Sequence, residues 1–224
     1  MISDICKVKN NFMKLLLATL FVCSISVCGH SQTSKSQTIL NTLSSSMKKM
    51  STFYVEFNAN IKNTATGVNE SEKGMGWVKG NKFFASYGEI TLLSNGYKTW
   101  TIINEEKSVY ESETSDDEES MNPKKLMTIW ESGFKNKYNK LGTFNGESVH
   151  VINLFPIDPE NSDYHTITLY ISEKSRALKK AIMKTNDGTT MSYHLTKFIS
   201  NKAISDSKFT FDKAKYPGFA VIRD

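Results

Sequence analysis

The chain has 224 residues, of which 39% are hydrophobic and 23% are charged. This length and balance are those of a soluble globular protein with one domain or at most two. The formal net charge of +5 is small and evenly scattered, so it gives no reason to expect nucleic-acid binding.

The N-terminal residues differ in kind from the rest. A basic start that ends at Lys14 leads into an apolar run, Leu15–Val27, which is too short to span a membrane as a stable helix. The small residue Ser31 then precedes Gln32, as at a signal-peptide cleavage site. We therefore expect residues 1–31 to be a signal peptide and 32–224 to form one domain. A buried N-terminal helix is the alternative.

The three cysteines, Cys6, Cys23 and Cys28, all lie inside this leader. The mature chain would then contain no disulfide, no catalytic thiol and no zinc-thiolate site. A second reading makes Cys28 the lipidated first residue of a lipoprotein, although the bulky Val27 stands where a small residue is expected.

Next, the spacing predicts an amphipathic helix followed by a long strand. Ser34 and Gln37 have the form of a capping box. Apolar residues then recur at helical spacing, at Ile39, Leu40, Leu43, Met47 and Met50. From Phe53 to Ile61 apolar and polar residues alternate, which indicates one buried and one solvated face of an antiparallel sheet.

Residues 74–103 predict a β-meander with unusually bulky side chains. Short apolar runs are separated by turn residues, and Asn95-Gly96 predicts a type I′ hairpin turn. A sheet with this many aromatic residues must be covered by a second layer, by helices or by a ligand.

A second amphipathic helix is predicted from Asn122-Pro123 to Phe134, with Leu126, Met127 and Trp130 on its apolar face. The remaining chain reads as strands, with strong turns at Asn145-Gly146 and Asn186–Gly188. We therefore expect a mainly β (α+β) fold. It would be a single large curved antiparallel sheet that curls or closes, with the two helices covering its concave face.

The motifs of common enzymes are missing from the sequence. No nucleophile elbow, phosphate loop or dinucleotide fingerprint occurs, and the acidic run 113–120 lacks the spacing of a calcium loop. His150, His165 and His194 stand singly in separate predicted strands. We expect neither an enzyme nor a metal or other cofactor. An enzyme would require these three histidines to converge.

Several stretches together resemble the periplasmic outer-membrane lipoprotein carrier family, LolA. They are Phe53–Ile61, Gly76–Lys79, Leu92–Trp100 and Phe209–Ile222. The resemblance implies an unclosed β-barrel lidded by helices. It also implies a monomeric carrier that moves lipoprotein acyl chains from an inner-membrane exporter to an outer-membrane receptor. In better-known members an arginine at this place latches the lid. This chain has Gly80 there, so the latch is either lost or made differently.

On this reading a hydrophobic cavity would be lined by Phe53, Phe57, Met75, Trp77, Trp100, Ile102, Trp130 and Met191. Leu40, Leu43, Met47, Leu126 and Met127 would belong to the lid helices, which fill the cavity until cargo displaces them. Two alternatives stay open: a tightly self-filled core, and a lipid-anchored receptor or lipoprotein sensor of the same fold.

Overall fold

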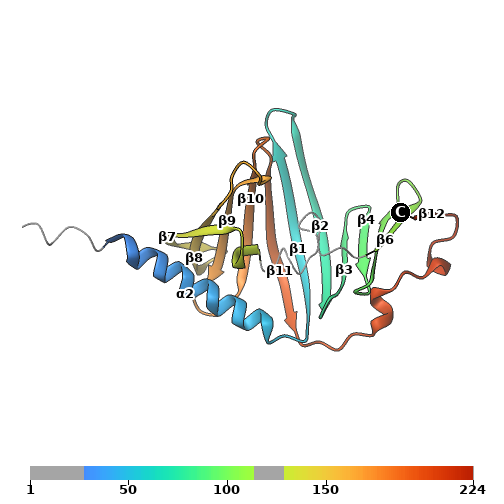
Figure 1. The fold of residues 1–224 in the computed structure, drawn as a ribbon, viewed down its shortest axis with the longest axis horizontal. Coiled ribbons are helices and arrows are strands. Elements are labelled where there is room, and N and C mark those ends of the chain that lie inside the picture. The colour runs from blue at the N-terminus through green and yellow to red at the C-terminus, as the bar shows by residue number, and fades with distance from the viewer. Residues whose placement is uncertain (1–27, 114–128, 224) are drawn as a thin grey trace, which may run out of the picture.

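The computed structural model describes residues 28–113 and 129–223, which form one twelve-stranded sheet and its covering segments (Figure 1). In chain order the elements are α2 (Cys28–Lys48), β1 (Thr52–Asn63), β2 (Val68–Lys79), β3 (Lys82–Tyr87), β4 (Ile90–Ser94), β5 (Lys98–Ile103), β6 (Ser108–Glu113), the 3₁₀ helix η1 (Ile129–Glu131), β7 (Phe134–Phe144), β8 (Glu147–Pro156), β9 (Tyr164–Ser172), β10 (Leu178–Thr185), β11 (Thr190–Ser200), the 3₁₀ helices η2 (Asp206–Phe209) and η3 (Lys213–Lys215), and β12 (Ala220–Arg223).

The predicted mainly β fold is confirmed. The strand order is β12-β6-β5-β4-β3-β2-β1-β11-β10-β9-β8-β7, so β12 and β7 are the two edges and the curved sheet does not close. All neighbours are antiparallel except β12, which pairs with β6 in parallel. None of the helices in the described part of the chain combines the length and hydrophobicity needed to cross a membrane.

The pairing register gives the sheet two distinct faces, because residues paired directly across strands point to the same side. The helix face carries Phe53, Val55 and Phe57 of β1 and their partners, and α2 lies against it (Figure 1). The opposite face carries Trp100 and Ile102, which pack with residues of the C-terminal segment 201–219. Each face therefore has its own hydrophobic core.

The first helix is longer than predicted. It begins at Cys28, so the proposed capping box at Ser34 lies within the helix and does not start it. The predicted apolar stripe is confirmed from Ile39 to Met47, with Leu40 1% exposed and Leu43 2% exposed. The helix ends at Lys48, so the predicted extension of the stripe to Met50 was wrong.

The predicted second helix is only partly visible. Residues 122–128, with Leu126 and Met127, lie outside the described residues. The described remainder forms η1, a short 3₁₀ helix that contains the buried Trp130. Phe134 does not continue a helix but opens β7, where it pairs with Pro156 of β8. The prediction of a helix through Phe134 was wrong because Gly133, with φ +77°, ends the helical backbone first.

The two Asn-Gly turns differ. At Asn145-Gly146 both residues have positive φ, as a type I′ turn requires. At Asn95-Gly96 only Gly96 does, so the type I′ prediction was wrong there. The Asn95 side chain instead accepts hydrogen bonds from the backbone N–H groups of Tyr97 and Lys98, which stabilises another turn shape.

Polar contacts fix α2 to η1 and to the edge strand β7. Asn136 of β7 accepts a hydrogen bond from Ser36 and donates one to Gln37. The Trp130 indole N–H donates to the Ser44 hydroxyl over 2.7 Å. These bonds join α2 to the β7 edge of the sheet and to η1.

A buried histidine lies beneath the same end of α2. Arg176, in the β9–β10 turn, can only donate, so His150 Nε2 accepts and its Nδ1–H faces the Tyr138 hydroxyl at 3.2 Å. Lys35 of α2 lies 4.1 Å above the Tyr138 ring. Burial lowers the pKa of His150 below 6.5, and Arg176 and Lys35 lower it further, against a smaller opposing effect of Glu173.

This cluster predicts acid-sensitive stability. Because the folded pKa of His150 is depressed, its contribution is present above the unfolded value of 6.5 and is lost as the pH falls below it. We expect the free energy of unfolding, measured in urea, to decrease from about pH 7.5 to about pH 5. His150→Gln should flatten this dependence, whereas His165→Gln, at an exposed position, should keep it. Equal slopes in all three proteins would contradict the prediction.

The β2–β3 turn at Gly80 holds the C-terminal segment through charge. Lys79 and Lys82, on either side of the turn, each place an ammonium group 2.8 Å from Asp206 of η2. Hydrogen bonds from these lysines lower the pKa of Asp206 from 3.8 to about 2. Gly80, which stands where the resemblance leads us to expect an arginine, therefore lies between two lysines. Both lysines bind the C-terminal segment, which covers the opposite face of the sheet.

We expect Asp206→Asn to loosen this segment locally, because both lysines lose their anionic partner. Amide hydrogen exchange of residues 204–210 should become faster, with little change in the melting temperature. In the wild type the carboxyl should titrate near 2 by NMR, so the ion pairs persist above 3.8 and are lost as the pH falls through about 2. The exposed Glu105→Gln serves as control, and unchanged exchange in Asp206→Asn would refute the assignment.

Candidate functional site: an aromatic hollow on the helix face

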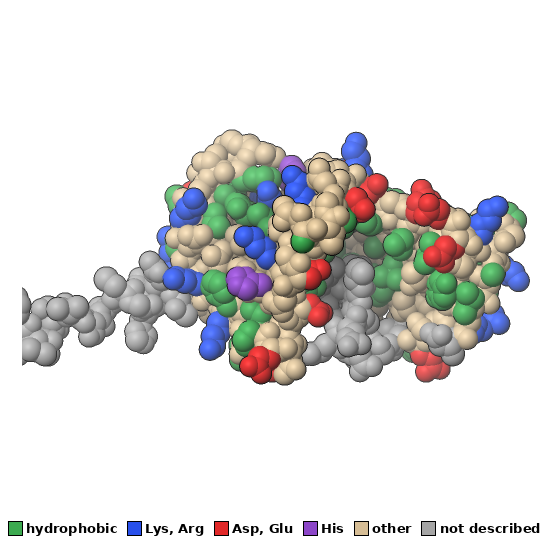
Figure 2. Space-filling view, turned by 90° about the horizontal axis from the view of Figure 1, so that it is seen from above, with side chains coloured by type: hydrophobic (Ala, Val, Ile, Leu, Met, Phe, Trp, Pro, Cys, Tyr) green, Lys and Arg blue, Asp and Glu red, His purple; other side chains and the backbone are tan. Residues whose placement is uncertain are grey.

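The centre of the helix face carries a group of aromatic residues that α2 does not bury. Phe57 of β1 pairs with Gly74 of β2, which pairs in turn with Tyr87 of β3. On its other side β1 pairs with β11, which brings Tyr193 and Met191 to the same face. All four of these side chains remain partly exposed. Figure 2 shows hydrophobic side chains at the surface of both halves of the molecule.

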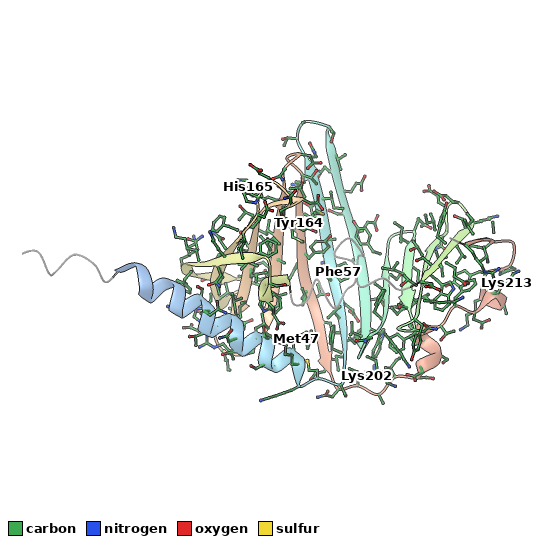
Figure 3. The ribbon with its side chains drawn as sticks, viewed as in Figure 1. Met47, Phe57, Tyr164, His165, Lys202 and Lys213 are labelled. Carbon is green, nitrogen blue, oxygen red and sulfur yellow. The ribbon has the colours of Figure 1, made fainter. Side chains whose placement is uncertain are left out.

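Phe57 is the central side chain of this group. A methyl group built on Gly74 would lie 2.2 Å from Phe57 Cζ, so the ring lies directly over a backbone that only glycine can provide. The ring stacks on Tyr87 at 6.4 Å between centroids and meets Tyr193 edge-on at 5.9 Å. Figure 3 shows Phe57 with Tyr164 and Met47, which belong to the same hydrophobic cluster.

A β-bulge fixes which residues of β1 and β11 meet here. The register shifts between Glu56 and Phe57, so Val55 pairs with Phe198 whereas Phe57 pairs with Leu195. Without the bulge, the pairing of β1 with residues 190–195 of β11 would shift by one residue. Because side chains alternate between the two faces of a sheet, that shift would turn Tyr193 and Met191 to the opposite face. The bulge therefore puts Tyr193 and Met191 beside Phe57.

The hollow is apolar but contains phenols. Burial is the largest cause of a raised pKa at Tyr87, Tyr164 and Tyr193, so all three hydroxyls stay protonated near neutral pH. Tyr193 points its hydroxyl at the Met191 sulfur over 3.8 Å. The site can thus accommodate hydrocarbon and also donate hydrogen bonds.

The structure divides the eight predicted cavity residues between the two faces. Phe53, Phe57 and Met191 lie on the helix face, and Trp130 packs against the same cluster. The other four, Met75, Trp77, Trp100 and Ile102, lie on the opposite face.

Those four have partners of their own. Trp77 lies 4.6 Å from the Tyr54 ring, and the Tyr54 hydroxyl reaches the Met75 sulfur over 3.5 Å. Trp100 stacks on Phe211 of the C-terminal segment.

Sequence reasoning missed Tyr87 and Tyr164 as members of the hollow. Tyr87 belongs to a strand with little alternation, and only the register across Gly74 shows that it lies next to Phe57. Tyr164 begins a strand that does alternate, but it is out of phase with the buried Ile167 and Leu169, and the β9–β10 register shifts beside it. The predicted lid residues Leu40, Leu43 and Met47 are buried in the same cluster as Phe53.

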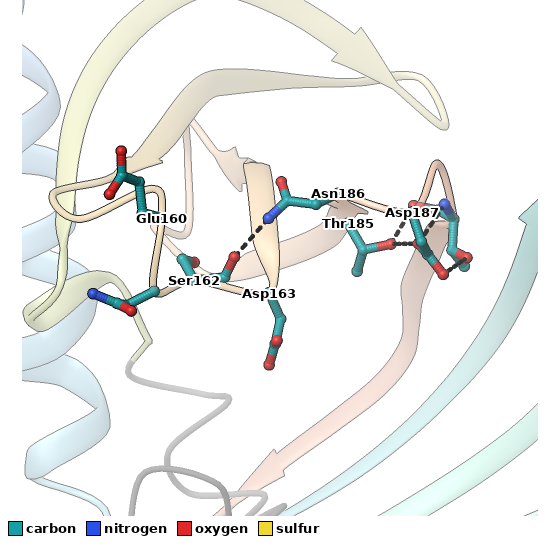
Figure 4. Close-up of a pocket in the computed structure, with 8 residues that line it drawn as sticks. Glu160, Ser162, Asp163, Thr185, Asn186 and Asp187 are labelled. Atoms are coloured by element: carbon teal, nitrogen blue, oxygen red, sulfur yellow. Dashed lines mark hydrogen bonds between the residues drawn. The ribbon is translucent and has the colours of Figure 1, made fainter.

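Two pockets lie elsewhere on the molecule, and most of the residues that line them are polar. One of about 720 Å³ lies between the β8–β9 loop and the β10–β11 turn (Figure 4), lined by Glu160, Asn161, Ser162, Asp163, Thr185, Asn186, Asp187 and Thr189. A second, of about 540 Å³, lies on the opposite face near His194 and Phe144. Charged or amide side chains contribute to the lining of both, as Asp163 and Asn186 do in the first and Glu72 and Asn145 in the second. Within the described residues no three His, Cys, Asp or Glu side chains could hold a metal ion.

Comparison with solved structures identifies a similar fold. An uncharacterized conserved protein from Thermus thermophilus superposes with a TM-score of 0.55 at 7% identity, over 85% of this chain and 99% of that one. A LolA superfamily protein from Nitrosomonas europaea gives 0.40 at 13% identity, covering 79% and 98%. Lipoprotein LppX from Mycobacterium tuberculosis gives 0.44 at 13% identity, covering 75% and 96%.

Sequence comparison gives the family. No curated protein matches the chain. A family model described as outer membrane lipoprotein carrier protein LolA matches residues 54–189, from β1 to the β10–β11 turn, which is more than half of the chain. The chain therefore belongs to the LolA family of outer membrane lipoprotein carrier proteins.

Proposed function

We propose that the chain is a periplasmic, non-enzymatic carrier that binds the acyl chains of lipoproteins, or of a related lipid, in the aromatic hollow. It would receive them from an inner-membrane exporter and deliver them to an outer-membrane receptor, as a monomer of residues 32–224. The observation that carries the proposal is the row of partly exposed apolar side chains around Phe57, which α2 leaves uncovered. Apolar side chains that gather at a partly exposed surface are a candidate for a binding site.

A carrier must also release its cargo. Burying an acyl chain contributes about 0.8 kcal/mol per CH₂, so one long chain would gain about 10 kcal/mol in an empty cavity. We propose that α2 reduces this gain: Leu40, Leu43 and Met47 already cover the part of the apolar face beside the hollow, in the same cluster as Phe53, so cargo that extends past the hollow replaces contacts that already exist. The polar bonds of Ser36, Gln37 and Ser44 would keep α2 attached to β7 and η1 while the contacts of its apolar stripe are exchanged.

Binding should depend on Phe57. We expect Phe57→Ser to weaken the displacement of a polarity-sensitive dye by a long-chain acyl lipid about tenfold, since burying one aromatic ring is worth about 1.5–3 kcal/mol. Phe155→Ser is the matched control, because Phe155 is 37% exposed on the opposite face. Circular dichroism melts of both variants establish that they are folded. A wild-type protein that takes up no lipid, or equal losses in both variants, would disprove the proposal.

The N-terminus of the exported protein separates a shuttle from an anchored receptor. Expressed with its own leader in a Gram-negative host, the carrier should be recovered from the soluble periplasmic fraction with an intact mass that starts near Gln32. A diacylated mass that starts at Cys28, found in the membrane fraction, would instead identify a lipid-anchored receptor or sensor.

A further inference from the structure

One hydroxyl in the hollow lacks a partner. The Tyr87 oxygen is shielded from solvent and is the single buried side-chain polar atom of the described residues that forms no hydrogen bond. Buried donors without partners are rare in folded proteins, because each costs the free energy of its lost hydration. The unpaired hydroxyl lies at the centre of the proposed cargo site.

Neighbouring residues fix the position of this hydroxyl. Tyr87 is held in β3 by pairing with Gly74 and Ile90, and its ring is stacked on Phe57. A phenol in this setting cannot rotate freely to find water. It is a preformed hydrogen-bond donor beside an apolar surface.

The surrounding charge restricts what the donor can meet. After burial, the carboxylates of Glu72 and Glu70 are the next causes that raise the pKa of Tyr87, so the phenol stays neutral. The same negative charges repel an anionic group such as a carboxylate or a phosphate. A neutral carbonyl oxygen can accept from the phenol without that repulsion.

We propose that the Tyr87 hydroxyl donates a hydrogen bond to the carbonyl oxygen of a neutral acyl ester or amide whose tails lie in the hollow. This inference rests on the proposed function and specifies its ligand as acylated and uncharged at the linkage. A ligand without the carbonyl would leave the buried hydroxyl unpaired and would therefore bind more weakly than a ligand that has it. The site would thus distinguish an acylated molecule from a plain hydrocarbon chain and from a free fatty acid.

A matched pair of probes tests the proposal. Dioctanoylglycerol carries ester carbonyls, and the corresponding dioctyl ether of glycerol has chains of similar length without them. We expect the wild-type protein to bind the diester about tenfold more tightly than the diether in dye displacement, the equivalent of one hydrogen bond. Tyr87→Phe should remove this preference while leaving diether affinity unchanged. Tyr97→Phe, at a side chain 83% exposed, should behave as wild type.

The outcomes separate the two proposals. If the wild type binds neither probe, the carrier function itself is refuted. If it binds both equally, or if Tyr87→Phe keeps the preference, the carrier function stands and the carbonyl contact is wrong. The free energy of unfolding gives an independent check: Tyr87→Phe should match or exceed the wild type, because it removes an unpaired hydroxyl. A clear loss of stability would show that the hydroxyl already has a structural partner and would overturn the inference.

Discussion

The close contact between the Phe57 ring and the backbone of Gly74 is the interaction on which the rest of the site depends. It requires a glycine in β2, a β1–β2 register that pairs the two residues, and a bulge in the β1–β11 pairing that brings Tyr193 alongside. Together these three features place aromatic side chains next to one another in the middle of the sheet. The ring lies low over the sheet and remains partly exposed.

The protein can leave the side chains around Phe57 partly exposed because two separate hydrophobic cores stabilise the sheet. On the helix face, α2, η1 and strands β7–β10 bury a large cluster at one end of the sheet. On the opposite face, segment 201–219 covers Trp100 and its neighbours at the other end. The fold is therefore stabilised at both ends and on both sides, and the central strands can leave the Phe57 group partly uncovered without losing the cores that hold the sheet together.

Much of the architecture follows from local patterns in the sequence. Alternation over Phe53–Ile61 and helical spacing over Ile39–Met47 both correspond to elements of the structure. The site was harder to predict, because bulky residues do not reveal which face they occupy. In β2, Met75 and Trp77 point away from the hollow, whereas the helix face receives Gly74 and Gly76. The face that each residue occupies follows only from the pairing register, which is a property of two strands together. The same register places Tyr87 next to Phe57.

The two unpaired edges of the sheet have a mechanical consequence. A closed barrel has a circumference fixed by its strand number and stagger, so its interior cannot widen without breaking a ladder. Here β7 and β12 are the ends of an open ribbon, whose bend can change through small adjustments of twist in every strand while each pair remains intact. The width of the sheet can in this way change without the loss of any strand pair.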